Sequence, residues 1–465
     1  MKTRIEEDSI GALEVPENAY YGVQSERAQR NFNITGLKMS IPFLKSMALI
    51  KKAAAITNYN AKLLEEDKKD AICKACDEII NGKYTDQFIV DPIQGGAGTS
   101  ANMNMNEVIA NVANEILGGK LGKYDLIHPN DHVNMAQSTN DVIPTAGKMT
   151  AITLLKPLLS ELYRLEEALR KKEYEFAHVL KMGRTQLQDA VPMTLGESFG
   201  SYASMIKRSI ARIEVSENEM RTINIGGTAI GTGINASEYY EDHICPTLSE
   251  LFGSELRKAE DLFDSTEHLD CFVEVSGSLK ALAVSLSKMC NDFRLLSSGP
   301  RCGLHEINLP AKQNGSSIMP GKVNPVIPEV VTQVCFLVMG HDTTIAIAAE
   351  AGQMELNAFE PVIFYQLFES ITALTGAITT LIDNCVLDIS ANVKHCLDLE
   401  QASVGIATAL VPYFGYKKSA TIAKRALYEN RTVREVVLEM KLMSESEIDK
   451  ILNPVDLVKW KKPIE

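Results

Sequence analysis

Several polar stretches of this 465-residue chain combine residue types that could do chemistry without a metal. They are rich in hydroxyl and amide side chains and nearly free of charge, and they comprise residues 94–106, 134–141, 183–188 and 315–325. None contains a His or Cys that could bind a metal. Neutral O–H and N–H donors suit a carboxylate, and above all a negative charge that develops on it during a reaction. Lys322, six residues after Ser316, adds a fixed positive charge.

The alternative for each stretch is an ordinary capped turn. Ser138, Thr139 and Asn140, for example, are residue types that cap helices by accepting backbone N–H bonds. The recurrence of such stretches at separate places in one chain favours a shared role in binding a substrate over unrelated structural roles.

Other well-known motifs do not fit. Residues 226–233 (GGTAIGTG) are glycine-rich but lack the GxGxxG spacing and the βαβ context of a dinucleotide site. Residues 95–100 (GGAGTS) lack the GK[ST] ending of a phosphate-binding loop. The chain has no HExxH motif of a zinc protease. Its one CxxC, Cys73 to Cys76, lies in a predicted amphipathic helix without a second pair, so we expect no zinc or redox role.

Long helices must position these polar stretches. The strongest apolar stripe has alternating spacings of three and four residues, and consists of Phe272, Val275, Leu279, Leu282, Leu286, Met289, Phe293 and Leu296. Similar stripes run from Leu154 to Phe176 and from Ile363 to Leu381, where we expect Pro361 to introduce a kink. The other faces of the first helix are small rather than charged, which is typical of a helix buried in a bundle. The pattern predicts an all-α fold of long helices in an elongated bundle, covered in part by other subunits.

Composition limits the function further. The chain is 45% hydrophobic and 23% charged with a net charge of −13, which argues against nucleic acid or an anionic membrane as a partner. The N-terminal sequence MKTRIEEDSIG lacks the apolar core of a signal peptide, and we expect no membrane span. An odd number of cysteines, nine, suits the reducing cytoplasm. We expect three parts with boundaries at 1–140, 141–394 and 395–465.

Residues 315–325, GSSIMPGKVNP, closely resemble the signature of the aspartase/fumarase superfamily. The resemblance extends over nearly the whole chain, through YYGVQSERA, DPIQGGAGTSANMNMNEVIAN, HVNMAQSTND, GRTQLQDAVP, GGTAIGTGIN and GQMELNAFEP. GGAGTS and QSTND are similar to the aspartase branch, where fumarases have GSGTQ and QSSND.

The resemblance implies reversible anti β-elimination of ammonia from L-aspartate to give fumarate, with no cofactor and no metal site. It implies a homotetramer whose composite sites lie at a central bundle donated by four subunits. Ser316 would be the catalytic base, acting as an alkoxide on a flexible loop. The substrate-binding positions implied are Thr99, Ser138, Thr139, Thr185 and Ser317 for the β-carboxylate, Lys322 and Asn324 for the α-carboxylate, and Asn140 and Gln186 for the amino group.

Two alternatives stay open at this point. A class II fumarase would use the same scaffold to eliminate water, and a helical scaffold or crystallin-like relative would have lost the chemistry. The combination of Ser316, Lys322 and Asn324 argues against lost chemistry, because a structural role does not need all three. Gln186 replaces a His that fumarases pair with a Glu, here Glu329, and a Gln cannot relay a proton to leaving hydroxide. Argininosuccinate- or adenylosuccinate-lyase activity is disfavoured, since larger leaving groups need a different lining.

Overall fold

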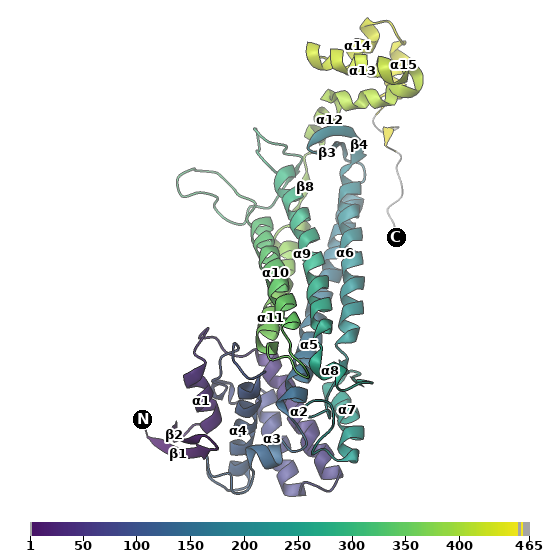
Figure 1. The fold of residues 1–465 in the computed structure, drawn as a ribbon. Helices are drawn as coiled ribbons and strands as arrows, with labels where there is room; N and C mark the ends of the chain where they lie inside the picture. The colour runs from purple at the N-terminus through teal and green to yellow at the C-terminus, as the bar shows by residue number, and fades with distance from the viewer. Residues whose placement is uncertain (1, 454–456, 459–465) are drawn as a thin grey trace. The chain divides into compact units, whose positions relative to one another are not determined.

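The computed structural model describes residues 2–453, 457 and 458, and it is built mainly of α-helices (Figure 1). Within these residues, the strands form two-stranded pairs with the order β1–β2, β3–β4, β5–β6 and β7–β8. The all-α prediction is therefore confirmed.

The chain divides into two compact units, each made of three stretches of sequence. Unit 1 comprises Met1–Leu159, Ala211–Ala281 and Phe336–Leu374, and unit 2 comprises Ser160–Ile210, Leu282–Cys335 and Thr375–Glu465. The expected three-part division at residues 140 and 394 stays a prediction, as do the elongated protomer and its multi-subunit bundle.

Long helices pass from one unit into the other along the chain: α5 (Thr139–Glu175), α6 (Leu195–Glu219), α9 (Asp270–Leu296), α10 (Val326–Glu350) and α11 (Glu360–Asn384). The predicted stripe on α9 is buried from Phe272 to Phe293. The expected kink at Pro361 was wrong. Pro361 is the second residue of α11, where the N–H it lacks has no partner within the helix, so it starts the helix instead of bending it.

Unit 1 places α2 (Ile41–Asn60) against both α3 (Glu66–Ile80) and α7 (Glu238–Phe252), with α4 (Thr99–Ile116) against α3. Its other elements are β1 (Thr3–Asp8), β2 (Gly11–Pro16), α1 (Val23–Asn31), η1 (Thr85–Gln87), η2 (Pro129–Val133), β5 (Thr222–Ile223), β6 (Arg257–Lys258) and α8 (Asp264–Glu267). The Phe364 ring of α11 packs on Phe43 of α2 and Phe272 of α9, with centroids 5.8 and 5.2 Å apart.

Unit 2 holds the β3–β4 hairpin (Leu180–Thr185 and Gln188–Thr194) and the C-terminal helices. These helices are α12 (Val393–Ala402), η4 (Val404–Leu410), α13 (Val411–Glu429), α14 (Val433–Glu439) and α15 (Glu445–Ile451). The remaining elements are β7 (Ile307–Asn308), η3 (Val386–Asp388) and β8 (Ser390–Ala391). Met182 of β3 is buried in one apolar cluster with Leu410, Ile422 and Val436, so the hairpin is fixed at its base to the C-terminal helices.

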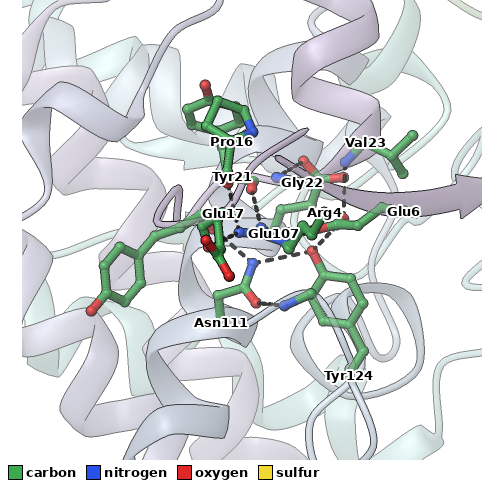
Figure 2. A network of polar contacts seen from close by, with 12 residues as sticks. Arg4, Glu6, Pro16, Glu17, Tyr21, Gly22, Val23, Glu107, Asn111 and Tyr124 are labelled. Carbon is green, nitrogen blue, oxygen red and sulfur yellow. Dashed lines mark hydrogen bonds and ion pairs between the residues drawn. The ribbon is translucent and has the colours of Figure 1, made fainter. Parts of the chain in front are cut away.

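A buried carboxylate joins α1 to α4 (Figure 2). Glu107 of α4 accepts N–H bonds from Gly22, Gln24 and Ser25 at 2.9, 2.9 and 3.1 Å, and so caps the start of α1, which has no side-chain cap of its own. A side chain at Gly22 would place Cβ 2.4 Å from Tyr124 Oη and 2.8 Å from Glu107 Cδ. Glycine at this position therefore lets α1 approach α4.

Candidate active site

Thr99 is the first residue of α4 and follows a glycine-rich loop. Gly96, Ala97 and Gly98 have φ of 79°, 53° and 87°, in the left-handed region. A side chain at Gly98 would place Cβ 2.9 Å from Ile143 Cγ2 on α5. Thr99 Oγ1 donates to Gly96 O at 2.7 Å, and the Thr99 side chain is exposed. The two glycines let the loop turn back tightly, and the turn presents the Thr99 hydroxyl at the helix start.

Ser138, Thr139 and Asn140 form the turn into α5, and all three are half-buried. Ser138 Oγ accepts the Asn140 N–H at 3.2 Å. Thr139 Oγ1 accepts from Asn102 Nδ2, on the first turn of α4, at 3.3 Å. Asn140 Nδ2 donates to Ala229 O at 2.7 Å, which leaves its Oδ1 as the acceptor side of the amide. Unit 1 thus brings this turn and the start of α4 together.

Asp141 anchors the same turn from a fully buried position. Its Oδ1 accepts the Ser138 N–H at 2.9 Å, and its Oδ2 accepts the N–H groups of Gly226 and Thr228 at 3.1 and 3.2 Å. Burial raises the pKa of Asp141 to about 6, against the lowering effect of these three bonds. The glycine-rich residues 226–233 therefore position the turn through their backbone, a role that sequence reasoning missed. The signal that could have revealed this role is the high glycine content of a segment that matches no phosphate-binding motif.

A buried amine also supports this turn. Lys51 of α2 is fully buried and donates from Nζ to Asn134 Oδ1 and Gln137 Oε1, both at 2.9 Å. Burial lowers its pKa to about 7, opposed by the nearby Asp141 charge. Sequence reasoning missed Lys51, because a lysine in a helix is normally expected on the face exposed to solvent.

Thr185 and Gln186 lie at the tip of the β3–β4 hairpin in unit 2, and both are exposed. Thr185 pairs with Gln188, so Gln186 and Leu187 are the two turn residues. Their φ values, 55° and 63°, are those of a type I′ turn, which normally takes Asn and Gly. A left-handed residue other than glycine costs on the order of 1 kcal/mol, so this tip is strained.

Ser316 lies in a small hairpin loop of unit 2, half-buried. Gly315 N donates to Lys322 O at 2.8 Å, and Asn324 Nδ2 donates to Gly315 O at 2.7 Å, which closes the stem of the loop. Ser316 Oγ accepts two backbone N–H bonds, from Ile318 at 3.2 Å and Met319 at 3.0 Å. Donors aimed at a hydroxyl oxygen favour its ionised form.

Two of the other three predicted groups of this loop face outward. Ser317 and Lys322 are exposed, and Asn324 keeps one N–H beyond the bond that it gives to the stem. These groups can reach a ligand outside the loop.

The predicted site residues thus form two sets in different units. Thr99, Ser138, Thr139 and Asn140 belong to unit 1, and Thr185, Gln186, Ser316, Ser317, Lys322 and Asn324 belong to unit 2. The hydrogen bonds join the two predicted segments of unit 1 through α4. They do not join the hairpin tip of unit 2 to the Ser316 loop directly.

Among residues 2–453, 457 and 458, no group of three or more His, Cys, Asp or Glu side chains is placed to hold a metal. The expectation of chemistry without a cofactor stays a prediction.

Comparison with known proteins settles the family. A family model described as lyase matches residues 11–340, and one described as the C-terminus of fumarase C matches residues 406–459. The chain belongs to the aspartase/fumarase family of lyases. This confirms the resemblance seen in residues 315–325.

Curated relatives match the lyase over nearly its full length. It is 54% identical to the aspartate ammonia-lyase of Helicobacter pylori over 457 residues, which is 98% of each chain. It is 48% identical to the aspartate ammonia-lyase of Escherichia coli over 458 residues, covering 98% of the lyase and 96% of the relative.

Solved structures share the fold. A fumarate lyase:delta crystallin from Brucella melitensis, bound to cobalt, aligns with a TM-score of 0.95 at 50% identity, over 98% of the lyase and 99% of that chain. A class II fumarase from Schistosoma mansoni aligns with the same TM-score at 35% identity, over 98% of the lyase and 99% of the fumarase chain.

Proposed function

We propose that the lyase catalyses the reversible deamination of L-aspartate to fumarate and ammonia. The observation that carries the proposal is the Ser316 oxygen, held by two backbone N–H groups on a loop that also bears Lys322 and Asn324. Relatives named aspartate ammonia-lyase, 46–54% identical over 98% of the chain, support the choice of substrate.

In the proposed reaction, the Ser316 alkoxide removes a proton from Cβ of aspartate. The electron pair of that C–H bond moves into the β-carboxylate, which becomes a dianionic aci-carboxylate. Its collapse forms the C=C bond and expels the amine as ammonia. Because charge accumulates on the β-carboxylate, donors preorganised around it lower the barrier most. The hydroxyl groups assigned to this carboxylate are those of Thr99, Ser138, Thr139, Thr185 and Ser317.

The remaining groups orient the substrate. Lys322 and Asn324 bind the α-carboxylate, and the side-chain oxygens of Asn140 and Gln186 accept from the ammonium group. The bond from Asn140 Nδ2 to Ala229 O supports this assignment, since it turns the acceptor oxygen of the amide away from that carbonyl.

The fumarase alternative has weaker support. The class II fumarase aligned above is 35% identical, against 46–54% for the aspartate ammonia-lyases. Departing hydroxide needs a proton donor, whereas an ammonium group leaves as neutral ammonia, and Gln186 can hold the ammonium but cannot supply a proton.

We also propose a homotetramer with composite sites. The proposal is supported by apolar side chains that α10 exposes and that a second copy would cover: Val330, Phe336, Leu337 and Ile347. Residues Val326–Glu350 and Glu360–Asp388 are long and apolar enough to span a membrane. However, Asp342 of α10 pairs with Lys280 and Ser276 of α9 at 2.6 and 2.8 Å, which suits a protein bundle.

All nine cysteines are free thiols, which supports the proposal that the protein works in the reducing cytoplasm.

Incubation with L-aspartate tests the proposed function. Fumarate, followed by its ultraviolet absorbance, and ammonia should form in equal amounts. Aspartate that yields no fumarate under these conditions contradicts the proposal.

A further inference from the structure

Glu306 is a fully buried carboxylate of unit 2 that lies between two cations. Its Oε1 accepts a hydrogen bond from Arg184 Nη2 at 2.9 Å, and its Oε2 lies 3.2 Å from Lys181 Nζ. Both cations belong to β3, and both are largely buried. The single negative charge of Glu306 therefore pairs with the positive charges of both Lys181 and Arg184. A neutral residue at position 306 would remove this anion from both cations.

The backbone of Glu306 is held as firmly as its side chain. Its N–H donates to Leu296 O at the end of α9 (2.8 Å), and its carbonyl accepts from Asn392 N at 2.9 Å. Glu306 directly precedes β7, and the loop that bears Ser316 follows it in the chain. The carboxylate is thus a fixed point to which β3 is tied.

Arg184 transmits this anchoring to the hairpin tip. It directly precedes Thr185 and pairs across the hairpin with Asp189. The strand register shifts between Met182 and Arg184, around Gly183, where a side chain would place Cβ 2.8 Å from Val191 O. Such a bulge redirects the next side chain, here the guanidinium that reaches Glu306.

The tip needs such an anchor because its turn residues do not favour their own conformation. Gln186 and Leu187 both have positive φ, and neither is Gly or Asn. A strained turn persists when surrounding contacts impose it. Arg184, bound to Glu306, is the charged contact nearest to the turn on the β3 side.

We propose that Glu306 is a positioning residue for the deamination of aspartate. Acting through Arg184, it holds the type I′ tip so that Thr185 and Gln186 are presented to the substrate. Glu306 itself touches no substrate. The inference rests on the proposed function, from which the roles of Thr185 and Gln186 are taken.

The test compares kcat and KM for L-aspartate in three variants of the full-length oligomer. Glu306→Gln should lower kcat/KM by about 10²-fold, the usual effect of an ångström-scale misplacement. Arg184→Lys should show a similar loss and stays folded, because Glu306 keeps its pairing with Lys181. Glu173→Gln, which breaks a partly buried ion pair with Arg170 in the same unit, is the control and should stay within about threefold of wild type.

A second-site change separates positioning from general stability. Leu187→Gly relieves the left-handed strain, so adding it to Glu306→Gln should recover about tenfold in kcat/KM without a matching rise in melting temperature. Full activity in both Glu306→Gln and Arg184→Lys overturns the inference. A folded double variant no better than Glu306→Gln overturns it as well. If Glu306→Gln fails to fold, the kcat/KM of Arg184→Lys alone decides: a loss supports the inference, and full activity overturns it. Wild-type turnover of aspartate is measured first, since its absence would instead overturn the proposed function.

Discussion

Ser316 has an environment unlike that of most catalytic serines. Within the part of the chain that the structure describes, no His forms a hydrogen bond with its hydroxyl, and its oxygen accepts two backbone N–H bonds from its own loop. The residue itself could be named from the resemblance of residues 315–325, but these bonds could not, since they depend on the loop's conformation. The same holds for Asp141 and Lys51. Their types are ordinary, and their importance comes from burial and from the backbone groups that they meet.

Ser316→Ala tests the assignment of the base. The variant should lose at least about 10²–10⁴-fold in kcat, the usual contribution of a general base, with fold and assembly unchanged. Steady-state assay of fumarate formation, alongside circular dichroism, measures both. The matched control is Ser201→Ala, at an exposed serine of α6 whose hydroxyl donates to Ser198 O of the same helix. Retention of more than about a third of wild-type kcat would show that another group takes the proton.

Gln186→His tests what separates ammonia from water elimination. His is tolerated at a positive φ, so the hairpin tip should persist. Aspartate turnover should stay within about tenfold, and malate turnover should rise, because His can protonate leaving hydroxide. Rates on both substrates are compared with those of wild type. If malate turnover does not change, Gln186 only lines the substrate site, and other residues determine whether ammonia or water is eliminated.

At the scale of elements, the long helices could be predicted and the hairpin could not. The stripe from Phe272 to Leu296 gave α9 nearly to its ends, because a long apolar repeat leaves few alternatives. The β3–β4 hairpin lacks the Asn-Gly or Asp-Gly turn that would have revealed it. Pro361 was misread because its effect depends on where the helix begins.

The cap of α1 by Glu107 predicts a pH dependence of stability. Burial raises the pKa of Glu107 to about 7, above its value in the unfolded chain. Between about pH 4.5 and 7 the folded state therefore binds more protons, so this group makes stability fall as pH rises, by up to about 1.4 kcal/mol per pH unit. Melting curves from pH 5 to 8 measure the slope.

Glu107→Gln should flatten that slope over the same range. Asp141, raised to about 6, contributes in the same direction and remains in the variant, so some slope persists. Parallel curves for variant and wild type would show that Glu107 does not titrate in this range.

At the scale of the whole molecule, the apolar side chains that α10 exposes support the proposed assembly. Thr99 lies in unit 1 and Ser316 in unit 2. If each site takes segments from different subunits, two inactive variants can complement each other. The small residues beside the apolar stripe predict faces that other subunits cover, but they do not show which segments of a partner would complete each site.

Mixing Ser316→Ala with Thr99→Ala therefore tests the composite site. After co-refolding at equal amounts, about a quarter of the sites should combine two wild-type segments and regain activity. Each variant refolded alone is the control. Mixed oligomers that form, as shown by a tag on one variant, but stay inactive would exclude composite sites.

The central claim is that this lyase eliminates ammonia from aspartate and not water from malate. The most direct test is a side-by-side measurement of kcat/KM for L-aspartate and L-malate with the wild-type protein, by fumarate absorbance. We predict a ratio of at least about 10² in favour of aspartate, the scale of a missing general acid. Equal values for the two substrates would contradict the ammonia-lyase assignment.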